Sequence, residues 1–173
     1  MITPTLPVYL LHIGGSRRDV GYVMASYTVG AMVMRPIAGA LVDRWGRKKT
    51  TILALLLAVI ATALYSVAGD ISLLTAVRGF HGLAFGMVGT AIGTMVIDTL
   101  PATRFSEGIG YFGLTSSFSM AITPMIGFWL IHRFGFPILF LMVMLLAVLS
   151  LSSSLLVRSG HDPAGDPPNI DLP

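Results

Sequence analysis

Long apolar runs alternate along most of the chain with short breaks that are polar or contain glycine. A helix that crosses the hydrocarbon core of a bilayer needs about 20 mostly apolar residues. Runs of this kind lie at residues 20–42, 50–68, 71–99, 108–131 and 136–157. The breaks between them, such as "DRWGRKK" and "HRFGF", suit turns between antiparallel neighbours. The pattern predicts an all-α membrane protein.

The first apolar stretch, residues 1–13, is too short to cross a bilayer. A helix of about a dozen residues is roughly 18 Å long, whereas the hydrocarbon core is about 30 Å thick. The basic segment and the small-residue cleavage site of a signal peptide are both missing from it. We interpret the stretch as the second half of a helix, so that residues 1–157 form a six-helix bundle with an incomplete first helix.

The composition supports a membrane protein. Of the 173 residues, 54% are hydrophobic and 11% are charged, and the mean hydropathy is +0.82, whereas about a quarter of a soluble domain is charged. Cysteine is absent, which excludes thiolate metal sites, and neither a metal nor a cofactor is expected. The net charge is only +3 and the basic residues lie in short loops. The expected partner is therefore the lipid bilayer and not a nucleic acid.

The lysines and arginines of the loops divide unequally between the two sides of the predicted bundle. Because cytoplasmic loops carry an excess of these residues, the loop "DRWGRKK" is predicted to face the cytoplasm, in the inner or plasma membrane. Residues 158–173 are rich in proline and aspartate, which predicts a disordered cytoplasmic linker. The cytoplasmic set is Arg44, Arg47, Lys48, Lys49, Arg104 and Arg158, and the opposite set is Arg17, Arg18 and Arg133.

Small residues mark the surfaces where membrane helices approach each other closely. The run 71–99 carries glycines spaced three, four, three and four residues apart, which predicts tight packing along the whole helix. The runs 50–68 and 136–157 contain no glycine and are predicted to face lipid. The spaced glycines are Gly79, Gly82, Gly86, Gly89 and Gly93.

Arg78, His81 and Phe85 share one face of the run 71–99, because they are spaced three and four residues apart. An arginine inside a span costs at least about 2.5 kcal/mol, so it normally faces a protein interior or a water-filled cavity. Arg35 lies at a similar depth in the run 20–42, although its long side chain could also reach the interface. These four residues are candidates for a substrate or proton pathway. His81 could instead be a hydrogen-bonded structural group.

Two segments of the chain resemble each other, "RPIAGALVDRWG" at residues 35–46 and "TPMIGFWLIHRFG" at residues 123–135. Both have Pro-x-x-Gly and end in arginine, an aromatic residue and glycine. The two helices are three apart in the count, so their equivalent ends lie on opposite sides of the membrane. This arrangement is typical of an inverted-topology repeat of three plus three helices in a transporter half.

The loop at residues 39–48 resembles the signature of the major facilitator superfamily, G-x-L-a-D-r-x-G-r-r/k, between the second and third helices. The run 71–99 resembles the family's arginine-centred motif through Arg78 and Gly82. The run 108–131 keeps only part of the pattern G-x-x-x-G-P-x-x-G-G of the family's exporters, which forms a helix-packing motif. The loop matches are Gly39, Leu41, Asp43, Arg44, Gly46, Arg47 and Lys48, and the packing-motif positions are Ser119, Thr123, Pro124 and Gly127.

The resemblance implies an N-terminal half of a transporter in which two six-helix halves rock around a central cavity. The missing C-terminal half would then be a partner of this chain. It also implies that Asp43 meets the N-terminal end of a helix from that half and keeps the cytoplasmic side closed, while Asp98 pairs with Arg47. Gly46 suits a tight turn, and Gly39 would allow a close approach between helices.

These features predict export of a small molecule, coupled to protons, by alternating access. Uptake by the same fold and a membrane module without transport are the alternatives. A proton-carrying acid would have to lie in the missing parts, since no Asp or Glu lies in the middle of a run. An enzyme is not expected, because H-E-x-x-H, G-x-S-x-G and paired membrane aspartates are absent from the sequence.

Overall fold

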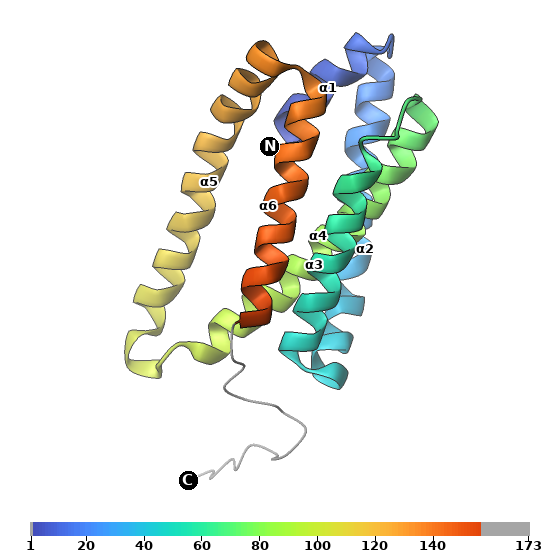
Figure 1. Cartoon of the computed structure of the whole chain (residues 1–173). Helices are drawn as coiled ribbons and strands as arrows, with labels where there is room; N and C mark the ends of the chain where they lie inside the picture. The colour runs from blue at the N-terminus through green and yellow to red at the C-terminus, as the bar shows by residue number, and fades with distance from the viewer. Residues whose placement is uncertain (1, 157–173) are drawn as a thin grey trace.

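The chain folds as a bundle of helices, which confirms the predicted all-α class (Figure 1). The structure is a computed structural model and describes residues 2–156, so the predicted linker at 158–173 lies outside the described residues. The long helices run up and down in alternation, and short turns join them. The elements are α1 (Ile2–His12), α2 (Arg17–Trp45), α3 (Arg47–Leu64), α4 (Ile71–Thr99), the 3-10 turn η1 (Ala102–Arg104), α5 (Phe105–Phe134) and α6 (Phe136–Leu156).

The helix ends follow from capping groups more than from the apolar runs. α2 begins before its apolar run, because Ser16 and Asp19 form a reciprocal capping box there. α3 ends at Leu64 although its apolar run continues to residue 68. The backbone N–H groups of Ser66 and Val67 donate to carbonyls only three residues back, which closes a tight turn in place of a further helical turn.

Among residues 2–156, four helices are long and apolar enough to cross a membrane: α2, α4, α5 with its preceding η1 turn, and α6. The sequence predicts a further span at residues 50–68, but α3, the helix that covers most of these residues, is not one of these four helices. It has 18 residues, and its first turn holds Arg47, Lys48 and Lys49. Together the four long helices make the chain a multi-pass membrane protein.

The closest helix pair is α2 with α4, and glycines make this approach possible. A Cβ atom added to Gly82 would lie 2.9 Å from Tyr27 Cα, and one added to Gly86 would lie 2.9 Å from Ala31 Cα. The Ser26 hydroxyl also bridges the pair by donating to the Thr75 carbonyl at 3.2 Å. Small residues that let two backbones touch are the usual device of packing in membranes.

This tight packing does not extend along the whole of α4. A Cβ atom added to Gly89 or Gly93 would meet no heavy atom within 4 Å. The prediction of close contact along the entire glycine stripe is therefore wrong for the C-terminal third of the helix, where α2 and α4 have diverged.

α3 is more buried than its lack of glycine suggests. One face packs through small residues that include Ala54, Ala61 and Thr62, all nearly inaccessible, and the helix contacts both α4 and α6. The opposite face exposes Leu56 and Ile60. The prediction that α3 faces lipid therefore holds for one side only, because alanine and threonine serve at close contacts as glycine does.

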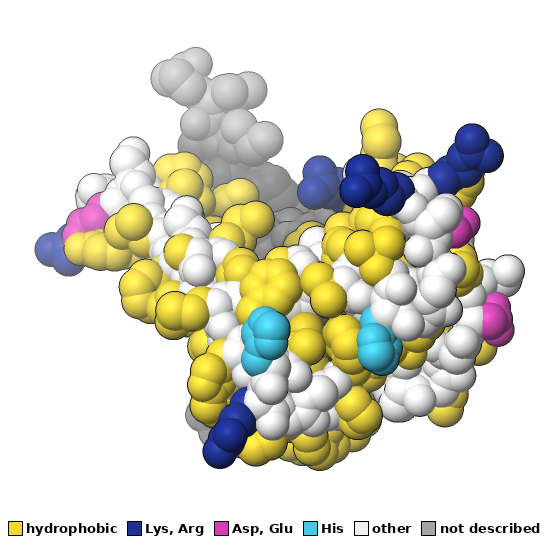
Figure 2. Space-filling model, turned by 90° about the horizontal axis from the view of Figure 1, so that it is seen from above, with side chains coloured by type: hydrophobic (Ala, Val, Ile, Leu, Met, Phe, Trp, Pro, Cys, Tyr) yellow, Lys and Arg dark blue, Asp and Glu magenta, His cyan; other side chains and the backbone are white. Residues whose placement is uncertain are grey.

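Much of the remaining surface is apolar. Hydrophobic side chains cover most of the end view of the bundle, and lysine and arginine lie towards its edge (Figure 2). Along α5, Tyr111, Leu114, Phe118 and Met120 are all at least 60% exposed. An apolar surface of this extent suits contact with lipid or with further helices.

The two ends of the predicted internal repeat have the same backbone geometry. Gly46 after α2 has φ 84° and ψ 159°, and Gly135 after α5 has φ 81° and ψ 179°. Each donates its N–H to the carbonyl four residues back, at 3.0 and 2.9 Å. Figure 1 places the α2–α3 turn and the α5–α6 turn at opposite ends of the bundle. This geometry agrees with an inverted repeat.

The glycine contacts generate a prediction about stability. Gly82→Ala should lower the free energy of unfolding by about 1 to 3 kcal/mol, because the new methyl group would meet backbone atoms that cannot move aside. Gly89→Ala is the matched control, since its methyl group would enter open space. Denaturant titration of the purified chain in detergent checks this, and equal losses in the two variants would contradict the assigned packing.

Candidate functional site

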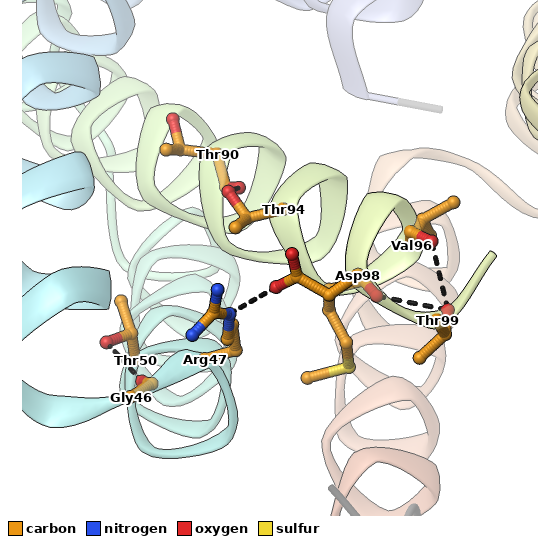
Figure 3. A network of polar contacts seen from close by, with 9 residues as sticks. Gly46, Arg47, Thr50, Thr90, Thr94, Val96, Asp98 and Thr99 are labelled. Atoms are coloured by element: carbon orange, nitrogen blue, oxygen red, sulfur yellow. Dashed lines mark hydrogen bonds and ion pairs between the residues drawn. The ribbon is translucent and has the colours of Figure 1, made fainter. Parts of the chain in front are cut away.

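The α2–α3 turn is tied to α4 by an ion pair. Arg47, in the first turn of α3, donates from Nε to Oδ2 of Asp98 near the end of α4 (Figure 3). The two side chains are 22% and 33% exposed. The carboxylate of Asp98 thus lies near the positive N-terminal end of α3, which favours it, although it opposes the dipole of its own helix. The predicted pairing of Arg47 with Asp98 is confirmed.

Asp43, one turn from the end of α2, is exposed. Within residues 2–156 no basic side chain forms an ion pair with it. A carboxylate at a helix C-terminus opposes the helix dipole, so nothing in the described part of the chain explains this acid as a stabilising group. Its side chain is available for contact with another polypeptide.

The remaining residues of the loop signature have different roles. Gly46 is buried and needs positive φ, as predicted, and its carbonyl accepts from the Thr50 hydroxyl at 2.9 Å. Leu41 packs in a small cluster with Ala38 and Met87.

A close helix approach was the expectation at Gly39, but a Cβ atom there would meet nothing within 4 Å, so that prediction is wrong for the described residues. Arg44 is exposed, and Lys48 donates to the Leu155 carbonyl at 3.4 Å.

A second polar group lies around Arg78, between α1, α2, the C-terminal end of α3 and α4. The Arg78 side chain has no exposed surface. Its guanidinium carbon lies 4.1 Å from the centre of the Tyr27 ring. Its two terminal nitrogens donate to Tyr65 Oη at 3.4 Å and to Thr3 Oγ1 at 3.1 Å. Among the described residues no carboxylate pairs with it.

These contacts offset only part of the cost of burying Arg78. A desolvated cation over an aromatic face gains about 2 kcal/mol, and the two hydroxyls accept hydrogen bonds. However, the buried Nε has no hydrogen-bond partner among residues 2–156, and an unsatisfied buried donor costs about 1 to 3 kcal/mol. The Nε–H group of Arg78 can therefore donate a hydrogen bond to one further acceptor.

The structure places Arg78, His81 and Phe85, which were predicted to share one face of α4, together around Tyr27. The Tyr27 ring lies 5.6 Å from the His81 ring and 5.5 Å from the Phe85 ring. His81 Nδ1 also lies 3.2 Å from Tyr65 Oη. The cluster extends from the fully buried Arg78 to Phe85, which is 49% exposed. His81 is thus hydrogen-bonded in a polar cluster, a geometry compatible with both of its predicted roles.

Sequence reasoning missed Tyr27 and Tyr65, the two residues that organise this cluster. Tyr27 lies on α2 and Tyr65 directly follows α3, and neither carries a motif of its own. The sequence offered only a general indication of their role, namely that a tyrosine within an apolar run has a hydroxyl that needs a hydrogen-bond partner when it is buried. That indication does not identify which polar group is the partner.

The other predicted residues lie apart from the Arg78 cluster. Arg35 is exposed on α2, eight residues and so roughly 12 Å along the helix from Tyr27. On α5, Gly127 is buried, while Thr123 and Pro124 are half-buried. Ser119 is exposed, and its hydroxyl donates to the Thr115 carbonyl of its own helix at 2.8 Å. Ser119 therefore makes no interhelical hydrogen bond in the described part of the chain.

Comparisons with known proteins place this arrangement in a family. A sequence profile of the Major Facilitator Superfamily matches residues 1–172. The chain is 27% identical over 127 residues to the quinolone resistance protein NorA of Staphylococcus aureus (strain MRSA252), covering 73% of this chain and 33% of NorA. It is 26% identical over 159 residues to Multidrug resistance protein 2 of Bacillus subtilis (strain 168), covering 91% of this chain and 39% of that protein. The chain spans about a third to two fifths of the length of these curated relatives.

The contact between Tyr27 and Arg78 generates a prediction. Tyr27→Leu should lower the free energy of unfolding by about 1 to 2 kcal/mol, because the guanidinium loses its aromatic face. Tyr27→Phe keeps that face and should remain close to the unchanged chain. Tyr22→Leu, on the exposed side of the same helix, is the control. Denaturant titration in detergent measures all three, and an equal effect of the two leucine variants would contradict the interaction.

Proposed function

Because the chain belongs to the Major Facilitator Superfamily, we propose that it forms one half of a secondary transporter that exports a small molecule in exchange for protons. The other half would be a second bundle that packs against this one, and the substrate would pass between them. The names of the relatives, which refer to quinolone resistance and multidrug resistance, support export over uptake. The membrane would be the cell membrane, with the α2–α3 turn on its cytoplasmic side.

One observation carries the proposal: at one end of the bundle, Arg47 is paired with Asp98 while Asp43 is exposed and unpaired within residues 2–156. The ion pair couples the α2–α3 turn to the end of α4, so these segments would move together. Asp43 is then the group that reaches outward, towards the N-terminal end of a helix in the other half. We propose that this contact closes the cytoplasmic side.

The energy of such a contact suits a gate. A carboxylate at a helix N-terminus contributes about 0.3 to 1 kcal/mol when exposed and up to about 2 kcal/mol when partly buried. Couplings of about 1 to 3 kcal/mol change an affinity roughly 5- to 150-fold. The contact is therefore strong enough to bias two conformations, and weak enough to break in every transport cycle.

The Arg78 cluster is the proposed lining of the pathway. The unpaired Nε–H of Arg78 would donate to an acidic group, either from the substrate or from a carboxylate in the rest of the transporter. His81, whose Nδ1 lies 3.2 Å from Tyr65 Oη, would relay a proton to and from a carboxylate in the rest of the transporter. Phe85 is exposed beside this pair, and Arg35 is exposed further along α2, where both would face the substrate.

Uptake and a membrane module without transport are the alternatives. A flux assay distinguishes export from uptake. In vesicles that contain the transporter and carry an imposed pH gradient, the two processes move a fluorescent quinolone in opposite directions relative to the proton flow. The coding DNA on either side of this reading frame distinguishes the second alternative. A further set of six apolar runs in the same frame would support a transporter half.

The exposed Asp43 generates the main functional prediction. Asp43→Asn in the transporter that contains this chain should abolish transport, or reduce its rate at least about fivefold, while the protein still inserts. Glu107→Gln is the matched control, since Glu107 is an exposed acid in the first turn of α5, and α5 begins at the same end of the bundle as the α2–α3 turn (Figure 1). Quinolone flux in vesicles checks both. Unchanged flux in Asp43→Asn would overturn the gate.

The ion pair generates a second functional prediction. Arg47→Asp should slow transport roughly fivefold, because it places two acids together, and Asp98→Arg should do the same by placing two bases together. The double variant that combines Arg47→Asp with Asp98→Arg should recover much of the transport rate, since it restores the attraction between an acid and a base. Lys49→Asp, an equal change of charge at an exposed neighbour, should have little effect. If the exchange recovers nothing, direct pairing is not what transport requires.

A further inference from the structure

A pocket of about 340 Å³ lies between α3, α4 and α6, at the end of the bundle where the α2–α3 turn lies. It is separate from the Arg78 cluster, and the proposed transport mechanism does not use it. Its volume lies at the lower end of the range for sites of small ligands. The walls from α4 include Val88 and Ile92, and those from α6 include Ser150 and Ser154.

The α3 wall of the pocket changes from charged to apolar along the helix axis. Lys48, Thr51 and Leu55 line the pocket, and their spacing of three and four residues places them on one face. At about 1.5 Å per residue, Thr51 lies roughly 4.5 Å deeper than Lys48, and Leu55 roughly 10 Å deeper. The order is therefore ammonium, hydroxyl and hydrocarbon from the end of the bundle towards its middle.

The hydroxyl of Thr51 has an unused hydrogen-bonding capacity. The residue is only 4% exposed, and its Oγ1 has no hydrogen-bond partner among the described residues. Threonines in helices commonly donate to a carbonyl one turn back, as Thr50, Thr75 and Thr90 do here. A buried hydroxyl that lines a pocket without any partner is a place where a ligand acceptor would be bound.

The mouth of the pocket is basic. Lys48 donates one bond to the Leu155 carbonyl at 3.4 Å, and an ammonium group has three donors. Arg47 and Lys49 flank it in sequence, and Arg44 lies four residues before it, in the last turn of α2. Basic residues clustered at the cytoplasmic end of membrane helices attract anionic lipids, and basic pockets between helices bind their head groups.

We propose that this pocket binds one anionic phospholipid of the leaflet at that end of the bundle. The lipid phosphate lies at Lys48, a glycerol-ester carbonyl accepts from the Thr51 hydroxyl, and one acyl chain occupies the apolar part beside Leu55, Val88 and Ile92. The order of groups along α3 is the order of groups along a phospholipid, from head to chain. The binding does not depend on the chain being part of a transporter.

Titration of the purified 173-residue chain in detergent with dioleoyl phosphatidylglycerol, followed by native mass spectrometry, tests the proposal. We expect one tightly bound lipid, and binding of dioleoyl phosphatidylcholine should be weaker. Lys48→Gln should weaken phosphatidylglycerol binding roughly fivefold, whereas Lys49→Gln, an exposed neighbour outside the pocket lining, should not. A circular dichroism spectrum of each variant verifies that the helices have formed.

Two further variants probe the apolar part. Ser150→Met places a longer side chain in the pocket and should weaken lipid binding. Ser152→Met makes the same change at another exposed position, outside the pocket lining, whose hydroxyl, like that of Ser150, donates to its own helix, and it should not. Thr51→Val removes the hydroxyl with almost no change of shape and should also weaken binding.

Three results would overturn the proposal. Equal losses in Lys48→Gln and Lys49→Gln would mean that the lipid follows the general positive charge of the turn. Equal binding in Ser150→Met and Ser152→Met would mean that no acyl chain enters the pocket. Competition by sn-glycerol 3-phosphate at the same concentration as the lipid would mean that the site takes a free phosphate.

Discussion

The contact between α2 and α4 is the constraint on which the rest of this structure depends. Water cannot drive helices together within a membrane, so they associate through close packing and hydrogen bonds. Gly82 and Gly86 allow the backbone of α4 to touch that of α2 at Tyr27 and Ala31. The same contact holds the Tyr27 ring over Arg78. The close packing of α2 against α4 and the position of Tyr27 over Arg78 thus have one cause.

The burial of Arg78 without a carboxylate partner among residues 2–156 follows from this scaffold. The aromatic face of Tyr27 and two hydroxyls offset much of the cost of removing the guanidinium from water. They leave the positive charge in place, because none of them carries a negative charge to neutralise it. A membrane protein that keeps an uncompensated cation in its interior has an electrostatic reason to bind an anionic group there.

The two ends of α4 serve different purposes because the helix diverges from α2 along its length. Near Gly82 the two backbones are in contact, while near Gly89 there is open space. Beyond that point α4 meets α3, where Asp98 pairs with Arg47. The pocket between α3, α4 and α6 lies in the same region, so the looser packing of this end leaves room for the proposed gate and for the proposed lipid.

The sequence by itself determined the helical class, the approximate limits of the helices, the tight turn at Gly46 and the pairing of Arg47 with Asp98. These depend on local hydropathy, on backbone conformation or on a pattern of residues within one family. Only the tertiary structure decided that Tyr27 and Tyr65 surround Arg78, that alanines and threonines bury one face of α3, and that Gly39 has no close neighbour among the described residues. These facts depend on how helices rotate against each other. A helix has several faces on which small residues or tyrosines could be used, and only its neighbours select among them.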